Sequence, residues 1–355
     1  MSALSLVFSG AAAIFEDPLT ILYFLIGVFG GIVFGAIPGL TGALGVSLML
    51  PFTFAMSPTQ GITVLIGIYV GGVSGGLIAS IMLNIPGNAA AIVTCFDGSP
   101  MARNGHPYRA LSYGATASLI GGLFSGVVMI FVATKLARFG LMFGAWEYFA
   151  LGIMGLAVVI SLCSDDMIKG LISAIIGMML AMIGMDKLSS LERFTFGWWR
   201  LSGGFGEMTV LMGLFALGEI LAQLKNLGKP MNQVDSDERR TVLPRKGAFK
   251  GLKKTLCVSS VIGTLIGVLP GVGQSTAALV AYNQAKNSSK EPEKFGTGCA
   301  EGIVAPESAN NAVCGGALIP MMTLGIPGDT ITAMLMSGLI VHGLAPGASL
   351  FSSNP

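Results

Sequence analysis

Four Pro-Gly pairs inside apolar segments constrain this chain more than any other feature of its sequence. The pairs are Pro38-Gly39, Pro86-Gly87, Pro270-Gly271 and Pro327-Gly328. Proline removes a backbone donor and ends helices, and glycine tolerates the backbone conformations that follow. In a bilayer, interrupted backbone persists only where it is buried in protein or lines a cavity, because lipid cannot satisfy its polar groups. The breaks therefore predict helices that stop and restart inside a membrane protein.

The composition places these segments in a membrane. Of the 355 residues, 53% are hydrophobic and 11% are charged, whereas about 25% charged residues is usual in soluble domains. Apolar runs of about 20 residues, the length of a membrane-spanning helix, recur along the chain. The predicted fold class is an all-α polytopic membrane protein. No basic, aromatic-rich face of the kind that binds nucleic acid is present in the sequence, and no cofactor is expected.

The positions of Lys and Arg predict the orientation of the chain. Residues 1–102 contain neither, and Arg103 and Arg109 are the first. The positive-inside rule therefore puts the segment around 97–110 in the cytoplasm and the N-terminus in the periplasm. Residues 225–254 hold nine basic residues against three acidic ones, which predicts a basic cytoplasmic loop. Between them, residues 111–224 lack proline and are expected to form a scaffold of plain spans near 111–133, 144–163, 167–185 and 206–224.

The breaks recur as an internal repeat. GAIPGLTGAL around Pro38 matches GVLPGVGQST around Pro270, and NIPGN around Pro86 matches GIPGD around Pro327. The offsets are 232 residues (270 minus 38) and 241 residues (327 minus 86). The difference of nine residues is expected in the polar link from Lys286 to Lys294.

The two repeats are predicted to have opposite orientations. The first repeat, residues 1–110, would enter the membrane from the periplasm, and the second, residues 255–355, from the basic cytoplasmic loop. Inverted repeats with broken helices or helical hairpins are the architecture of secondary transporters. No block of plain helices follows the second repeat, so we expect it to be truncated, either because the chain is shortened or because another polypeptide completes the bundle.

Four segments resemble a known family. They are GAIPGLTGALGVSLMLPFTF, GGLIASIMLNIPGNAAAIVTCFDGSPMARNGHP, GVLPGVGQSTAALVAYNQAK and CAEGIVAPESANNAVCGGALIPMMTLGIPGDTITAMLMSGLIVHGLAPG. The family is the large membrane subunit of the tripartite tricarboxylate transporters. The resemblance implies a carrier of the bacterial inner membrane that imports carboxylates such as citrate with an ion gradient. It also implies a small membrane subunit and a periplasmic solute-binding protein as partners, and family members that continue beyond this length.

Candidate ligands follow the breaks or lie in the polar stretch from Gly298 to Thr330. Backbone N–H groups at the starts of half-helices suit a carboxylate substrate, although helix capping alone explains the same residue types. Pro306 and Pro320 are expected to interrupt this stretch. The candidate substrate- or ion-binding residues are Thr41, Asn84, Gly87, Asn88, Gln274, Ser275, Glu307, Ser308, Asn310, Asn311, Asp329 and Thr330.

The coupling ion is left open between sodium and a proton. Sodium binds oxygen ligands, which Asn310, Asn311 and Asp329 offer. Glu301 or Glu307 could instead carry a proton, because burial in a dry cavity favours the neutral form of a carboxyl group. For Glu301, a place at the membrane interface is the alternative.

Other motifs in the sequence bear on alternative functions. GVLPGVGQST resembles a phosphate loop, but Gln274 stands where that motif requires Lys, which excludes a nucleotide site. An intramembrane aspartyl protease would need Asp329 to share a proton with a second aspartate, for which Asp97 is the best candidate. A stand-alone carboxylate carrier and a passive channel are the remaining alternatives. An enzyme is not expected.

Overall fold

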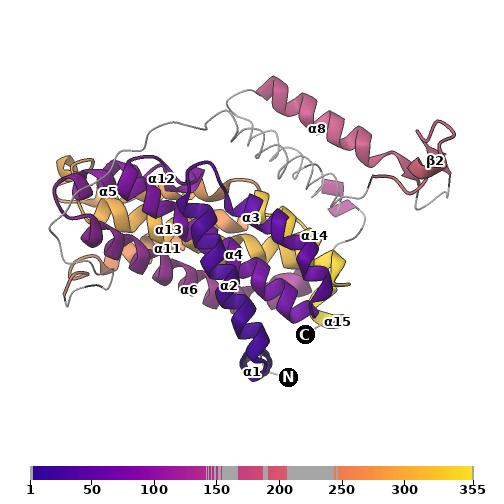
Figure 1. Cartoon of the computed structure of the whole chain (residues 1–355), viewed down its shortest axis with the longest axis horizontal. Helices are drawn as coiled ribbons and strands as arrows, with labels where there is room; N and C mark the ends of the chain where they lie inside the picture. Colours follow the sequence, from indigo (N-terminus) through magenta and orange to yellow (C-terminus); the bar gives the residue numbers. More distant parts are fainter. Residues whose placement is uncertain are drawn as a thin grey trace.

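The structure is a computed structural model that describes residues 3–140, 167–186, 191–205 and 247–353, with residue 244 and a few single residues between 142 and 153. Helices form almost all of the regular structure in these ranges (Figure 1). Three helices are long and apolar enough to cross a bilayer, at Pro18–Ala36, Pro58–Leu83 and Pro107–Arg138. The predicted fold class, an all-α polytopic membrane protein, is confirmed.

The described helices and 3-10 turns are, in chain order, α1 (Ala3–Glu16), α2 (Pro18–Ala36), α3 (Gly42–Met49), η1 (Leu50–Ala55), α4 (Pro58–Leu83), η2 (Ala89–Ala91), α5 (Thr94–Arg103), α6 (Pro107–Gly140), α8 (Met167–Ala181), η4 (Trp199–Leu201), α11 (Lys253–Val268), α12 (Gly273–Ser288), η6 (Pro292–Lys294), α13 (Glu301–Leu324), α14 (Thr330–Val341) and α15 (Leu350–Ser353). Two short strands, β1 (Gly184–Met185) and β2 (Glu192–Arg193), pair in antiparallel register.

Each Pro-Gly pair separates two consecutive elements. Pro38-Gly39 lies between α2 and α3, and Pro86-Gly87 lies between α4 and η2. In the same way, Pro270-Gly271 separates α11 from α12, and Pro327-Gly328 separates α13 from α14. The chain therefore stops and restarts a helix at all four predicted breaks.

The expectation that Pro306 and Pro320 interrupt the polar stretch is wrong. Both residues lie inside α13, which runs without a break from Glu301 to Leu324. A proline inside a helix removes one hydrogen bond and normally bends or ends the helix. Here α13 contacts α4, α5, α6, α11, α12 and α14, and nearly all of its residues are buried. Packing on every side fixes the helical path, which local propensity alone does not predict.

Glycines bring the central helices to backbone contact. A Cβ atom on Gly121 of α6 would lie 2.1 Å from the carbonyl oxygen of Ser308 on α13. On Gly315, a Cβ atom would lie 2.6 Å from the carbonyl carbon of Ser125 on α6. Small residues at such positions let membrane helices approach closely. The helix α6, predicted as part of a plain scaffold, therefore packs directly on the polar helix α13.

The contacts between helices repeat with the offsets of the sequence. A Cβ atom on Gly35 would lie 2.1 Å from the carbonyl oxygen of Gly72, and one on Gly267 would lie 2.8 Å from that of Val313. These positions differ by 232 residues (267 minus 35) and by 241 residues (313 minus 72). The α2–α4 pair and the α11–α13 pair thus pack through equivalent positions. The boundaries of the repeats and their opposite orientations stay predictions.

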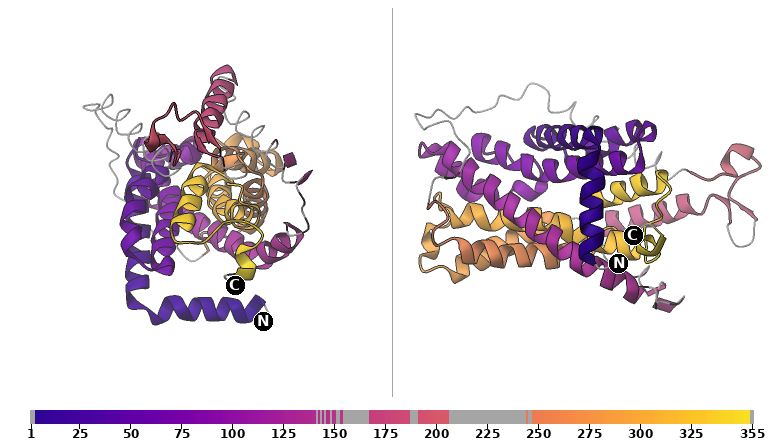
Figure 2. Two further views of the ribbon diagram at one scale, coloured as in Figure 1. Left: turned by 90° about the vertical axis from the view of Figure 1, so that its right-hand side faces the viewer. Right: turned by 90° about the horizontal axis from the view of Figure 1, so that it is seen from below.

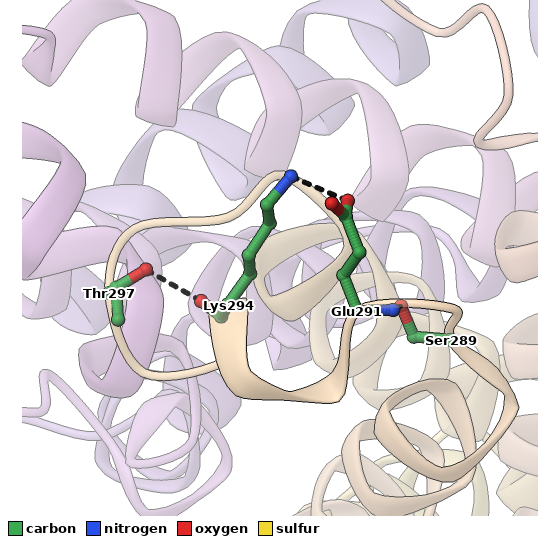
Figure 3. Close-up of polar contacts among 4 residues, drawn as sticks. All are labelled: Ser289, Glu291, Lys294 and Thr297. Carbon is green, nitrogen blue, oxygen red and sulfur yellow. Dashed lines mark hydrogen bonds and ion pairs between the residues drawn. The ribbon is translucent and has the colours of Figure 1, made fainter.

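The link between α12 and α13 is a polar surface turn (Figure 3). Lys294 forms an ion pair with Glu291 three residues earlier, and both side chains are exposed. The hydroxyl of Thr297 donates to the carbonyl oxygen of Lys294 at 2.8 Å, closing the turn. The expected nine-residue insertion, from Lys286 to Lys294, covers the end of α12 and this turn.

The helix α1 lies across the beginning of α2 (Figure 2). Asp17 separates the two helices and caps α2 by accepting a hydrogen bond from the backbone N–H of Leu19 at 3.0 Å. Its other carboxylate oxygen accepts from Gln60 at the start of α4, at 2.8 Å. One half-buried carboxylate therefore joins the starts of two spanning helices.

Some predicted elements lie largely outside the described residues. These are the spans near 144–163 and 206–224 and most of the basic loop 225–254. The helix α8 falls within the predicted span 167–185 and is drawn apart from the main bundle (Figure 1).

Candidate functional site

The first group of polar side chains, the Asp329 cluster, surrounds the break before α14 and consists of Asp329, Tyr69, Gln274 and Thr332. One carboxylate oxygen of Asp329 accepts from the hydroxyl of Tyr69 at 2.6 Å and from the side-chain amide of Gln274 at 3.2 Å. The other accepts from the backbone N–H of Thr332 at 2.7 Å, as in an N-terminal capping box. The backbone N–H of Gly271 also donates to the carbonyl oxygen of Gly328 at 2.8 Å. Both breaks of the second repeat therefore meet at this cluster.

The helices that restart after the breaks differ in how their first turns are capped. Thr41 caps α3, Asn88 caps η2 and Asp329 caps α14, each through its side-chain oxygen. The helix α12 has no side-chain cap, and its N-cap residue is Val272. The first N–H groups of a helix lack partners within the helix and attract anions. At the start of α12, which carries Gln274 and Ser275, no side-chain cap occupies the N–H groups of the first turn, so these groups are available to an anionic ligand.

The second group, the Glu307 cluster, consists of Glu307, Thr94, Ser118, Asn310, Asn311 and Ser74. The carboxylate of Glu307 has no solvent exposure and accepts hydrogen bonds from the hydroxyls of Thr94 and Ser118. The distance to the Ser118 hydroxyl is 2.9 Å, and the amide of Asn310 lies at 3.5 Å. All three partners are neutral. A buried carboxylate without a basic partner is unusual, because the protein must replace the solvation of its charge.

Two asparagines extend this cluster toward α4. The amide of Asn311 donates to the side-chain oxygen of Asn310 at 2.6 Å and to the backbone oxygen of Glu307 at 3.1 Å. Its own side-chain oxygen accepts from the hydroxyl of Ser74 at 2.7 Å. Ser74 and Tyr69 lie on the same helix and are separated by five residues. Their separation along the helix axis is therefore roughly 7 to 8 Å. The Glu307 and Asp329 clusters are thus neighbours along α4.

The remaining predicted residues do not all join these clusters. Asn88 donates to the carbonyl oxygen of Gly72 on α4 at 2.9 Å, and the hydroxyl of Ser308 donates to the carbonyl oxygen of Ala305 in its own helix. Gly87 is buried, and a Cβ atom there would lie 2.2 Å from the carbonyl oxygen of Gly35. Three of the candidates are exposed, and within the described residues no hydrogen bond ties them to either cluster: Asn84, Ser275 and Thr330.

The expected sodium ligands are divided between the two clusters. Asn310 and Asn311 belong to the Glu307 cluster, whereas Asp329 bonds Tyr69, Gln274 and Thr332. The sequence alone does not predict this division, because it depends on which helix faces each side chain. No group of three or more His, Cys, Asp or Glu side chains that could hold a metal ion occurs in the part of the chain that is described.

Sequence reasoning missed Tyr69, Thr94 and Ser118. Tyr69 is fully buried in a glycine-rich span, and Thr94 is the first residue of α5. Ser118 lies on α6, inside the segment predicted to be a plain scaffold. A single hydroxyl in an apolar run carries little signal in a sequence, because serine and threonine can bond to their own helix backbone.

The two aspartates of the protease alternative belong to different surroundings. Asp97 is fully buried and accepts from the backbone N–H groups of Gly296, Gly298 and Cys299 and from the hydroxyl of Tyr282. It therefore holds the loop before α13, while Asp329 caps α14. A catalytic aspartate pair requires two carboxylates close enough to share a proton, and no hydrogen bond between these two carboxylates is described.

Spanning helices that break around buried polar side chains define a class, the polytopic α-helical membrane proteins that enclose a polar site. The chain matches the family model described as "Tripartite tricarboxylate transporter TctA family" over residues 21–355, and it belongs to this family. The expected resemblance is confirmed, and the family is one of transporters.

Two relatives from Agrobacterium vitis are both named as uncharacterized proteins. The chain is 35% identical to the uncharacterized 52.8 kDa protein in the TAR-I ttuC' 3' region, over all of this chain and 70% of that protein. It is 44% identical to the uncharacterized protein in the TAR-II ttuC' 3' region over 83 residues, which are 23% of this chain and 34% of that protein. No solved structure matches the chain.

Proposed function

We propose that this chain is the large membrane subunit of a secondary carrier that imports tricarboxylates or related carboxylates, such as citrate, across the bacterial inner membrane. Its N-terminus would lie in the periplasm. A small membrane subunit and a periplasmic solute-binding protein would act with it, and an ion gradient of sodium or protons would drive uptake. Membership in the family supports this proposal.

The observation that carries the proposal is the uncapped start of α12 beside the Asp329 cluster. A carboxylate needs hydrogen-bond donors and positive potential, and the first turn of a helix supplies both. Gln274 lies in this first turn with its amide beside Asp329, and Ser275 is exposed next to it. Interrupted helices that offer such ends at the membrane midplane are a feature of secondary transporters. The substrate would therefore bind where the two breaks of the second repeat meet.

The test is uptake of labelled citrate into proteoliposomes that contain this chain and the small subunit. The binding protein is added outside, with and without an inward sodium gradient and, separately, a pH gradient. We expect uptake that needs both the binding protein and one of the gradients. Uptake without the binding protein would favour a stand-alone carrier. Uptake that equilibrates and ignores both gradients would favour a passive channel.

Three substitutions test the site within the same assay. We expect Asp329→Ala, Asn311→Ala and Asn88→Ala to abolish uptake while the protein still reaches the membrane. Asn287→Ala is the matched control, because Asn287 is exposed near the end of α12. Unchanged uptake in all three variants would refute the assignment of these residues to the site.

A further inference from the structure

The Glu307 carboxylate is compensated differently from the two other carboxylates on the helices around it. Asp97 accepts from three backbone N–H groups and a tyrosine hydroxyl, which fix a negative charge in place. Asp329 lies at the start of α14, where the helix dipole and a capping box favour an anion. Glu307 lies in the middle of a helix and has two hydroxyls and one distant amide as donors. Its negative charge is the least compensated of the three.

The groups near the Glu307 carboxylate are two hydroxyls and the amide nitrogen of Asn310, whose side-chain oxygen accepts from Asn311. Thr94 comes from α5, Ser118 from α6 and Asn310 from α13 itself. A hydroxyl that donates to a carboxylate keeps two lone pairs, and it can turn its proton toward a carbonyl of its own helix. Oxygen ligands with one carboxylate suit a small, hard cation better than a softer metal. With the two hydroxyl protons turned in this way, the oxygens of Glu307, Thr94 and Ser118 can all face a cation.

Within the described residues, no hydrogen bond or ion pair joins a positive side chain to the Glu307 carboxylate. The hydrogen-bond partners described for the Glu307 carboxylate are all neutral. On α11, Lys253 and Lys254 are exposed at its beginning. The titratable and charged side chains on the helices packed around Glu307 are Tyr69 on α4, Cys95, Asp97 and Arg103 on α5, Tyr108, Arg109, Tyr113, Lys135 and Arg138 on α6, Lys253, Lys254 and Cys257 on α11, Tyr282 and Lys286 on α12, and Glu301 and Cys314 on α13.

We propose that the Glu307 cluster binds the coupling cation, a sodium-sized monovalent metal ion held by the Glu307 carboxylate and the hydroxyl oxygens of Thr94 and Ser118. This inference rests on the proposed function, and it moves the anionic ligand for sodium from Asp329 to Glu307. The ion would be held between α5, which follows the second break, and the part of α6 at Ser118, which lies outside both predicted repeats. Binding of the ion would therefore affect how a broken helix packs on the predicted scaffold. Asp329 would remain the cap of α14 beside the substrate.

The first measurement compares two activities of the same proteoliposomes: accumulation of labelled citrate driven by a sodium gradient, and exchange of labelled for unlabelled citrate without a gradient. We expect Glu307→Gln to lower the ratio of accumulation to exchange by roughly tenfold or more, because a charge-assisted ligand is lost. Glu301→Gln is the control, since it removes a half-buried carboxylate from the same helix and should leave the ratio unchanged. A wild-type ratio in Glu307→Gln would overturn the proposal.

Two further variants keep the Glu307 carboxylate, and they test the proposal even if Glu307→Gln does not fold. Thr94→Val and Ser118→Ala should each raise the sodium concentration for half-maximal uptake by roughly tenfold, because each removes one ligand oxygen. The citrate concentration for half-maximal uptake should change much less. Sodium dependence equal to wild type in both variants would overturn the proposal. Full citrate uptake driven by a pH gradient in the absence of sodium would also overturn the proposal.

A binding measurement separates this inference from the proposed function. The thermal unfolding of the detergent-solubilised protein is followed in sodium chloride and in choline chloride at equal ionic strength. A ligand that binds only the folded state raises Tm, so we expect sodium to raise Tm of the wild type and of Glu301→Gln but not of Glu307→Gln. This result would support the site even if citrate is not transported. A wild-type Tm that does not respond to sodium would refute it.

Discussion

Asn88 and Asp329 hold the same structural position in two different parts of the chain, 241 residues apart (329 minus 88). Both are N-cap residues in extended conformation, with φ and ψ of −144° and 171° for Asn88 and −151° and 179° for Asp329. Each accepts a hydrogen bond from the backbone N–H three residues later, Ala91 and Thr332 respectively. One position of the repeat therefore carries a neutral cap in the first copy and an anionic cap in the second.

The first prediction separates capping from charge at Asp329. Asparagine and aspartate cap helices about equally well, whereas alanine costs about 0.5–2 kcal/mol. We expect Asp329→Asn to retain most of the stability that Asp329→Ala loses, and we expect both variants to lose citrate uptake. Chemical unfolding in detergent and uptake in proteoliposomes measure the two effects. Normal uptake by Asp329→Asn would show that capping, and not the charge, is what transport requires.

The second prediction concerns the contact between α2 and α4. A Cβ atom on Gly31 would lie 2.5 Å from the carbonyl oxygen of Ile68, whereas one on Gly30 would meet nothing within 4 Å. We expect Gly31→Ala to destabilise the protein by about 1–3 kcal/mol, as overpacking usually does. Gly30→Ala is the adjacent control and should be neutral or slightly stabilising. Equal unfolding free energies for the two variants would contradict the close packing of these helices.

The third prediction concerns the loop that Asp97 holds. Asp97→Asn replaces one acceptor oxygen with an amide group that faces backbone N–H groups of the loop, for example that of Gly296. Leaving a buried donor unsatisfied costs about 1–3 kcal/mol, so the variant should unfold more easily than Glu301→Gln. The measurement is Tm in detergent. A variant with wild-type Tm would show that the loop before α13 does not depend on this carboxylate.

The fourth prediction concerns Asp17, the N-cap residue of α2. Hydrogen bonds from Gln60, from Thr20 and from the backbone lower the pKa of Asp17 below its usual value. A carboxyl group whose pKa is lowered by folding stabilises the folded state above its unfolded pKa, and this contribution is lost as the pH falls through the folded pKa. We therefore expect the wild type to have a higher Tm than Asp17→Ala at neutral pH, with the difference shrinking in acid.

A Tm difference between wild type and Asp17→Ala that stays constant from neutral pH to about pH 3, close to the ordinary pKa of aspartate, would contradict a role for the ionised carboxylate. Salt should reduce the difference only slightly, because the main partners of Asp17 are neutral hydrogen-bond donors.

The class of the protein and the four Pro-Gly breaks could be predicted from the amino-acid sequence. Apolar length and low charge identify spanning helices because the bilayer admits little else. Pro-Gly pairs mark the breaks because proline cannot continue a helical hydrogen-bond ladder. The internal repeat could also be predicted from the sequence. Its offsets at Pro38 and Pro86 recur between the α2–α4 contact of Gly35 with Gly72 and the equivalent α11–α13 contact. The resemblance to the family depended on the same motifs.

Which polar side chains meet depends on how the helices pack against one another. Pro306 and Pro320 stay inside a helix because α13 is enclosed by its neighbours, and burial outweighs local propensity. Glu307 and Asp329 fall into separate clusters because α5 and α6 face one and α12 faces the other. The partners of a buried charge are fixed by helix packing over distances of 200 residues or so in the chain, as between Thr94 and Glu307. No local pattern encodes such a pairing, because the energy that selects it arises only when the helices pack together.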